Sequence, residues 1–130
     1  MSLLIEISKI PISFICPKIQ GRNEKNAASG WIEMDIVPIP ETLNKNYETQ
    51  KKIVEAKGCR IPSVVEAVVR NLMLYTFFDE LREKKSSWGY TRCSDKGRDK
   101  TVIVGLLGRE GLHVNYGIGL KTGVAAVRKL

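Results

Sequence analysis

The chain has few of the residues that catalysis and metal binding in small proteins usually require. Its 130 residues include one histidine, His113, and three widely spaced cysteines, Cys16, Cys59 and Cys93, with no C-x-x-C pair. A single histidine excludes a histidine-based metal cluster and a serine–histidine–aspartate relay. The odd number and wide spacing of the cysteines argue against a disulfide framework and a structural zinc site. We expect three separate thiols, with one disulfide and a spare thiol as the alternative.

Phosphate-binding loops and clustered carboxylates are also missing. The glycines at positions 105, 108 and 111 do not open a helix, so they predict no phosphate site. Asp95 and Asp99 flank basic residues, which is typical of a solvated turn rather than of a catalytic pair. No carboxylate cluster suits calcium. We therefore expect no enzymatic activity, no cofactor and no metal.

No stretch of the sequence predicts a membrane span. The longest apolar stretch near the N-terminus runs from residue 3 to residue 16, and Glu6, Lys9 and Pro11 interrupt it. It is too short to cross a membrane and lacks the basic leader and cleavage site of a signal peptide. We expect no direct membrane insertion, and a location either in the cytoplasm or on display through another protein or a virion.

Charge is distributed unevenly along the chain. Residues 1–80 carry ten basic and ten acidic side chains, whereas residues 81–130 carry eleven and four, so the whole net charge of +7 lies in the last part. Such asymmetry predicts an acidic partner, which could be a protein surface, a polyanion or nucleic acid. The alternative is that basic loops simply solvate the domain.

The length predicts one domain, over residues 1–130, with a hydrophobic core of its own. Asn44 or Asn46 is placed to cap a first helix, and Gly58 to end it with a positive φ. Before this helix, short apolar or alternating stretches are typical of strands. These predicted strands cover residues 3–5, 10–15 and 31–37.

A second, longer helix is the clearest element in the sequence. Pro62 stops any helix before it, and Ser63 with Glu66 forms an S-x-x-E capping box. From Val64 to about residue 83 the apolar side chains form a wide stripe, which predicts a helix buried on most of its circumference. The stripe contains Val65, Val68, Val69, Leu72, Met73, Phe77 and Leu81.

Beyond residue 85 the pattern changes to short strands with long connections. The run 93–100 is polar and predicts an exposed turn, and the three glycines between residues 115 and 123 predict a loop. Strands are expected at residues 101–104, 112–114 and 124–130. Strands, two helices and further strands in this order predict an α+β fold.

Two separated motifs resemble a known fold family. Arg60-Ile61-Pro62-Ser63 with Glu66 is similar to the Arg-Leu-Pro-Thr…Glu motif that opens a helix in formylglycine-generating-type domains. Gly123-Val124 and Val127-Arg128 look like a variant of their closing Gly-Phe-Arg. Residues 44–130 thus resemble the C-type-lectin fold, in the branch that includes these enzymes and the archaeal and viral variable proteins of diversity-generating retroelements.

The resemblance implies two helices packed on short antiparallel strands, with long connecting loops. Residues 44–88 would form a helical frame, and residues 89–130 a ligand-binding part made of strands and loops. The oxygen-dependent enzymes of this branch look as though they need a cysteine pair at a metal, and no pair in this chain matches it. The resemblance therefore implies a non-enzymatic variable protein whose C-terminal surface is diversified by a retroelement.

The expected partner is a protein ligand on another cell or virus, and the basic charge favours an acidic one. A basic nucleic-acid-binding domain is the alternative, less favoured because no helix-turn-helix, zinc-finger or RNP-like pattern is present. The oligomeric state stays open. Strand alternation assigns Val102, Val104, Leu112 and Val114 to the core. The residues implied as ligand-binding and variable are Tyr90, Arg92, Ile103, Leu106, Gly108, Arg109, His113, Asn115, Tyr116, Ile118, Leu120 and Thr122.

Overall fold

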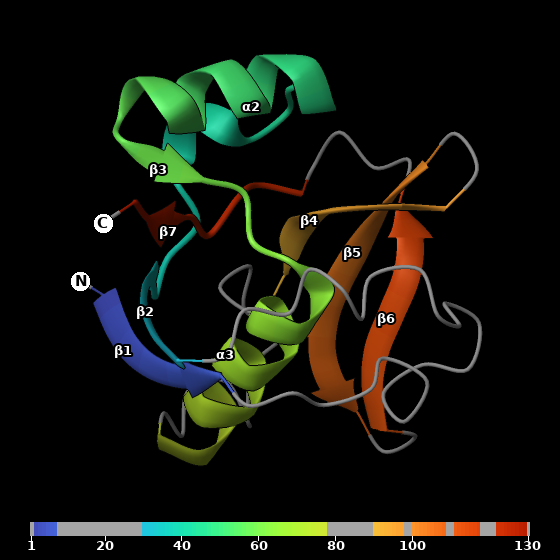
Figure 1. Cartoon of the computed structure of the whole chain (residues 1–130). Helices are drawn as coiled ribbons and strands as arrows, with labels where there is room; N and C mark the ends of the chain where they lie inside the picture. Colours follow the sequence, from blue (N-terminus) through green and yellow to red (C-terminus); the bar gives the residue numbers. More distant parts are fainter. Residues whose placement is uncertain are drawn as a thin grey trace.

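The computed structural model describes residues 2–7, 30–77, 90–97, 100–108, 111–117 and 122–129. Within these ranges the chain forms two α-helices, one 3-10 turn and two antiparallel sheets (Figure 1). The predicted α+β class is therefore confirmed. In the same part of the chain, no helix is long and apolar enough to cross a membrane.

The first sheet brings the two ends of the described chain together. Its strand order is β1-β2-β7-β3, so that the last strand lies between strands from the first half of the chain (Figure 1). The predicted strands at 3–5 and 31–37 correspond to β1 and β2, whereas the one at 10–15 lies outside the described residues. The strand bounds are Ser2–Ile7 for β1, Gly30–Asp35 for β2, Cys59–Arg60 for β3 and Val127–Arg128 for β7.

Helix α2 (Tyr47–Ala56) follows a 3-10 turn, η3 (Pro40–Thr42), and both of its predicted ends are confirmed. The Asn46 side chain caps it by accepting a hydrogen bond of 2.9 Å from the backbone N–H of Thr49. Gly58 follows the helix with φ +72°, a conformation that glycine adopts at little cost. The chain then turns directly into β3.

Helix α3 (Val64–Phe77) is the central element of the core and lies between the two sheets (Figure 1). Its capping box is formed as predicted, because the Ser63 N–H donates to Glu66 Oε1 at 2.8 Å and the Glu66 N–H to Ser63 Oγ at 3.2 Å. Leu72 is 45% exposed, so its predicted place in the buried stripe was wrong. Residues 78–83, the predicted end of this helix, lie outside the described residues. The described buried apolar side chains of α3 are Val64, Val65, Ala67, Val68 and Leu74.

The second sheet, in the order β4-β5-β6, corrects two predicted loops. Residues 93–97 belong to a strand rather than an exposed turn, and Cys93 is fully buried against α3 and β5. Residues 115–117 likewise continue a strand. The polar side chains of the first segment and the glycines of the second suggested loops, but cross-strand pairing satisfies the backbone groups of both segments. The bounds are Thr91–Gly97 for β4, Lys100–Gly108 for β5 and Gly111–Gly117 for β6.

The three residues before β7 run extended without joining a regular ladder. Their N–H groups donate to side-chain oxygens instead of to a neighbouring backbone: Val124 to Thr42 Oγ1 at 2.9 Å, Ala125 to Thr91 Oγ1 at 2.9 Å and Ala126 to Asp35 Oδ2 at 3.3 Å. The predicted strand at 124–130 is therefore only two residues long, Val127–Arg128, in the described part. Side chains from three different elements hold this closing segment in place.

Gly123 permits the closing segment to approach the turn at η3. A Cβ atom at this position would lie 3.1 Å from atoms of Leu43, Pro38 and Thr42. We expect Gly123→Ala to lower the free energy of unfolding by about 1–3 kcal/mol, because the proline ring cannot move aside. Urea unfolding measures this change. Lys129→Ala, a change at an exposed position just after β7, is the control and should shift stability by less than about 0.5 kcal/mol. Equal stabilities for the two variants would contradict the prediction.

Candidate functional site

Three of the predicted variable positions line up across the second sheet. Arg92 on β4 lies opposite Ile103 on β5, and Ile103 lies opposite Asn115 on β6. Directly opposed residues of antiparallel strands share one face of the sheet. The neighbouring row, Thr91, Val104 and Val114, is buried against the core. The predicted alternation of the sheet is therefore confirmed at Val102, Val104 and Val114.

The expectation that Arg92 and Thr122 face solvent was wrong. Arg92 is 5% exposed and Thr122 is 9% exposed. The closing segment covers this end of the sheet: the Arg92 N–H donates to the Gly123 carbonyl at 3.0 Å, and the Gln50 side chain donates to the Thr122 carbonyl at 2.7 Å. Burial also lowers the pKa of Arg92. Alternation identified the correct face, but it could not show what covers that face.

The other predicted contact residues fall into two groups. Tyr90, just before β4, is 37% exposed, and Ile103 is half-buried. The remaining positions stay predictions. Leu106, Gly108, His113, Asn115 and Tyr116 lie on described strands without described side-chain placement, whereas Arg109, Ile118 and Leu120 lie outside the described residues.

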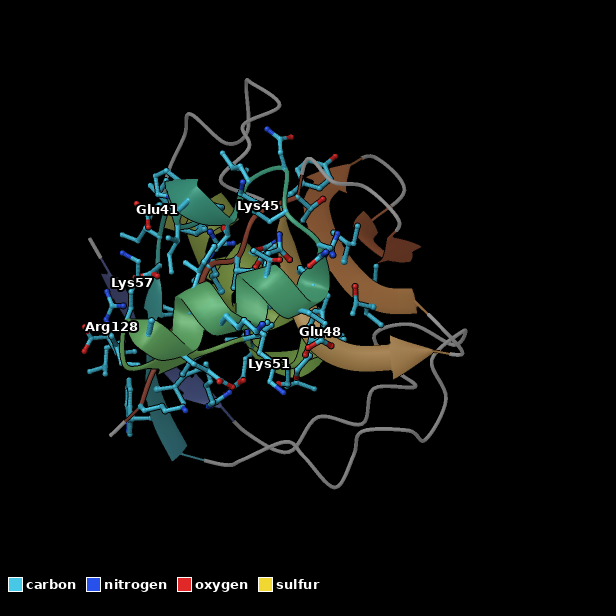
Figure 2. All side chains as sticks on the ribbon, turned by 90° about the horizontal axis from the view of Figure 1, so that it is seen from above. Glu41, Lys45, Glu48, Lys51, Lys57 and Arg128 are labelled. Atoms are coloured by element: carbon cyan, nitrogen blue, oxygen red, sulfur yellow. The ribbon has the colours of Figure 1, made fainter. Side chains whose placement is uncertain are left out.

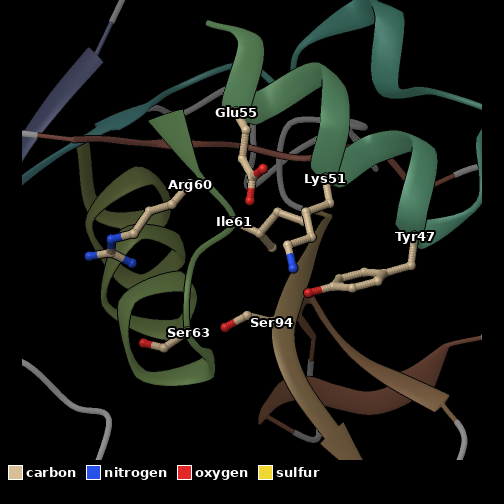
Figure 3. A pocket seen from close by; sticks show the side chains of 7 residues that line it. All are labelled: Tyr47, Lys51, Glu55, Arg60, Ile61, Ser63 and Ser94. Atoms are coloured by element: carbon tan, nitrogen blue, oxygen red, sulfur yellow. The ribbon is translucent and has the colours of Figure 1, made fainter. Parts of the chain in front are cut away.

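A groove of about 320 Å³ lies where α2 meets β4 and the start of α3 (Figure 3). Sequence reasoning missed it. Tyr47, Lys51 and Glu55 are spaced by four residues on α2, a pattern that places them on one side of the helix, and that spacing is the signal that could have found them. The other lining residues are Arg60, Ile61, Ser63 and Ser94.

Arg60, at the edge of this groove, forms a structural ion pair with Glu66. Its guanidinium donates to the two carboxylate oxygens of Glu66 at 2.7 and 2.6 Å, and Glu66 is only 2% exposed. The hydrogen bond to Glu66 raises the pKa of Arg60. The motif that resembles the family's helix-opening sequence thus has a clear local role: it fixes the start of α3.

A second groove, of about 380 Å³, opens beside η3 and the C-terminal end of α2. Figure 2 shows Glu41, Lys57 and Arg128 together at this end. Lys57 pairs with Glu41 at 3.0 Å, and Arg128 pairs with Asp35 at 2.7 Å, so the charges here are compensated. Hydrogen bonding to the buried Cys59 Sγ, followed by the charge of Asp35, raises the pKa of Arg128.

The described residues offer no metal centre, since they contain no group of three histidine, cysteine or acidic side chains able to hold an ion. Cys59 and Cys93 are both buried and carry free thiols, while Cys16 lies outside the described part. The chain matches no protein-family model, and comparison with curated proteins and with solved structures found no similar one.

Proposed function

We propose that this chain is a non-enzymatic ligand-binding protein with a C-type-lectin fold. In this proposal residues 44–88 form a fixed helical frame, and the strands and loops of residues 89–130 form a sequence-variable surface that a retroelement diversifies. The partner is a protein ligand on another cell or virus. The binding surface excludes Arg92 and Thr122, which are buried.

The order of the elements supports the lectin-fold part of the proposal. Strand β2, which precedes both helices, pairs with the final strand β7 in one sheet, and the strands between α3 and β7 form a separate sheet (Figure 1). The resemblance implies a chain that ends in a closing strand, and the pairing of β7 between β2 and β3 supports it. The two motifs that resemble the family lie at these elements, one at the start of α3 and one at β7.

The observation that supports the binding proposal is that the contacts holding the second sheet in place are separate from its outward side chains. The frame holds the second sheet through backbone contacts, such as the Ser94 N–H to the Pro62 carbonyl at 2.8 Å, and through α3 packing. These contacts do not depend on the outward side chains of the sheet. Exposed substitutions on such a frame usually change stability by less than about 0.5 kcal/mol, so many sequences can share one backbone.

Deep sequencing of this gene in many copies from its source population tests the proposal. We expect substitutions to concentrate between residues 90 and 122 at adenine-derived codons, with residues 44–88 and 123–130 nearly invariant. Within the window, Arg92 and Thr122 should vary less than Tyr90, because the first two are buried. Substitutions spread evenly along the gene, or absent from residues 90–122, would contradict diversification by a retroelement.

A basic nucleic-acid-binding domain is the second candidate, and one observation favours it: the net charge of +7 lies entirely in residues 81–130. Binding of random-sequence DNA and RNA, measured at two salt concentrations, separates the candidates. Affinity that falls steeply with salt and ignores sequence supports nucleic acid. Capture of a protein ligand that persists after nuclease treatment supports the first proposal.

A further inference from the structure

A bulge in β5 interrupts the pairing of β5 with β6. Before the bulge, Val104 lies opposite Val114. After it, Leu107 lies opposite Leu112, so β5 uses three steps where β6 uses two. Residues 105 and 106 thus share one opposing position on β6. Such an extra residue leaves backbone groups outside the ladder, and a buried backbone group needs another hydrogen-bond partner.

The partner of this bulge is a side chain of α3. Gly105 is buried, and its carbonyl accepts a hydrogen bond of 2.7 Å from the side-chain amide of Asn71. Asn71 is only 5% exposed and lies in the middle of the helix. Asparagine is an unfavourable residue inside a helix, and burying its amide without partners is costly. The bond to the sheet therefore accounts for the presence of Asn71 at this position.

Arg70 fixes the orientation of the Asn71 amide. Its guanidinium donates to Asn71 Oδ1 at 2.7 Å, which leaves the amide N–H groups for the Gly105 carbonyl. The same guanidinium donates to the carbonyls of Asp35 and Ile36 at the end of β2. Because the bond from the guanidinium is charge-assisted, it opposes rotation of the amide. A chain of hydrogen bonds thus runs from the first sheet through α3 to the bulge in the second sheet.

We propose that Asn71 is a positioning residue of the proposed binding surface, because it holds the β5 bulge in register. A shift of one residue in register moves every later residue of a strand to the opposite face. Three positions expected to contact a ligand lie at or beyond the bulge: Leu106, Gly108 and His113. The bond from Asn71 therefore decides which face this part of the hairpin presents. This role rests on the proposed binding function, whereas the register itself can be measured without a ligand.

Asn71→Asp tests this role, since aspartate keeps an oxygen that accepts from Arg70 but has no N–H for the Gly105 carbonyl. In NMR spectra of the full chain, we expect the nuclear Overhauser contacts between the backbones of residues 107 and 112 to weaken. The backbone amides of these two residues should exchange with solvent about tenfold faster, as expected when a buried carbonyl loses its donor. The contacts between residues 102 and 116, which lie before the bulge, should persist.

Ser63→Ala is the matched control, because it removes the cap at the start of α3 and leaves the bond to Gly105 in place. It should lower the stability of the protein without changing the register of β5 against β6. Two results overturn the proposal: contacts between residues 107 and 112 that are unchanged in Asn71→Asp, or an equal loss of these contacts in Ser63→Ala.

A second measurement uses the unchanged protein, so it does not depend on the folding of a variant. The side-chain N–H protons of Asn71 should exchange with solvent more than about tenfold more slowly than those of Asn44, which is exposed. Equal exchange rates for the two asparagines would also overturn the proposal. None of these results bears on the sequencing test of the variable surface, and evenly spread substitutions in that test would leave the measured register as it is.

Discussion

Replacing Arg70 with methionine is expected to lower the free energy of unfolding by about 2–5 kcal/mol. Arg70 is completely buried on α3, and its guanidinium donates to the Asp35 carbonyl at 2.9 Å, to the Ile36 carbonyl and to Asn71 Oδ1 at 2.7 Å. The two bonds to carbonyls tie the central helix to the end of β2. Methionine fills a similar volume but leaves the three acceptors without this donor.

Two opposing effects determine the size of the loss. Burial lowers the pKa of Arg70 to about 10 in spite of the attraction of Asp35, so removing the charge returns a net cost of about 3 kcal/mol. Three hydrogen bonds to a charged donor contribute about 1.5–3 kcal/mol each, and orphaned buried carbonyls add their own penalty. The lost hydrogen bonds outweigh the recovered desolvation, and the net effect is destabilising.

Urea unfolding of the methionine and lysine variants measures this balance. Lysine keeps the charge but not the planar guanidinium fork, so the free energy of unfolding of Arg70→Lys should lie between those of the original protein and the methionine variant.

The pH dependence of stability is a second measurement. Because the pKa of Arg70 is lower in the folded than in the unfolded protein, the cost of burying its charge is fully present below about pH 10 and declines as the pH rises above that value. The stability difference between the original protein and the Arg70→Met variant should therefore widen above about pH 10; a methionine variant as stable as the original at neutral pH would refute the argument.

The sequence predicted those elements whose signals are local. Asn46 and Gly58 at the ends of α2, and Ser63 with Glu66 at the start of α3, act within one turn of the chain, so spacing alone identified them. The α+β class followed from the same local patterns. Arg70 was missed because two of its acceptors, the carbonyls of Asp35 and Ile36, lie about 35 residues earlier, and no local pattern marks a buried arginine.

The candidate sites show the same limit. Alternation placed Val102 and Val104 in the core, but it could not show that the closing segment covers Arg92, because that contact joins residues far apart in sequence. The run 93–97 looked like a turn because its side chains are polar, yet pairing with β5 makes it a strand. The groove at Lys51 depends on α2 and β4 meeting, which tertiary packing alone determines.

The second large effect is expected at Glu66. Its buried carboxylate accepts both hydrogen bonds of the Arg60 fork and also the Ser63 N–H. We expect Glu66→Gln to lower the free energy of unfolding by about 2–4 kcal/mol, because the amide keeps the shape but loses the charge and one acceptor. Urea unfolding measures the loss, and Ser63→Ala, which removes only the other half of the capping box, should cost about 1 kcal/mol.

A double-mutant cycle with Arg60→Met separates the ion pair from the cap. Arg60 is partly exposed, whereas Glu66 is buried. When Arg60 alone is replaced, the Glu66 carboxylate still accepts the hydrogen bond from the Ser63 N–H. Bidentate geometry and burial of one partner predict a coupling energy of about 1.5–3 kcal/mol, above the value of about 0.2–1 kcal/mol for exposed pairs. A coupling energy within the range for exposed ion pairs would mean that Glu66 acts only as a helix cap. The motif that resembles the family's helix-opening sequence would then owe its role to Ser63 and Glu66, without Arg60.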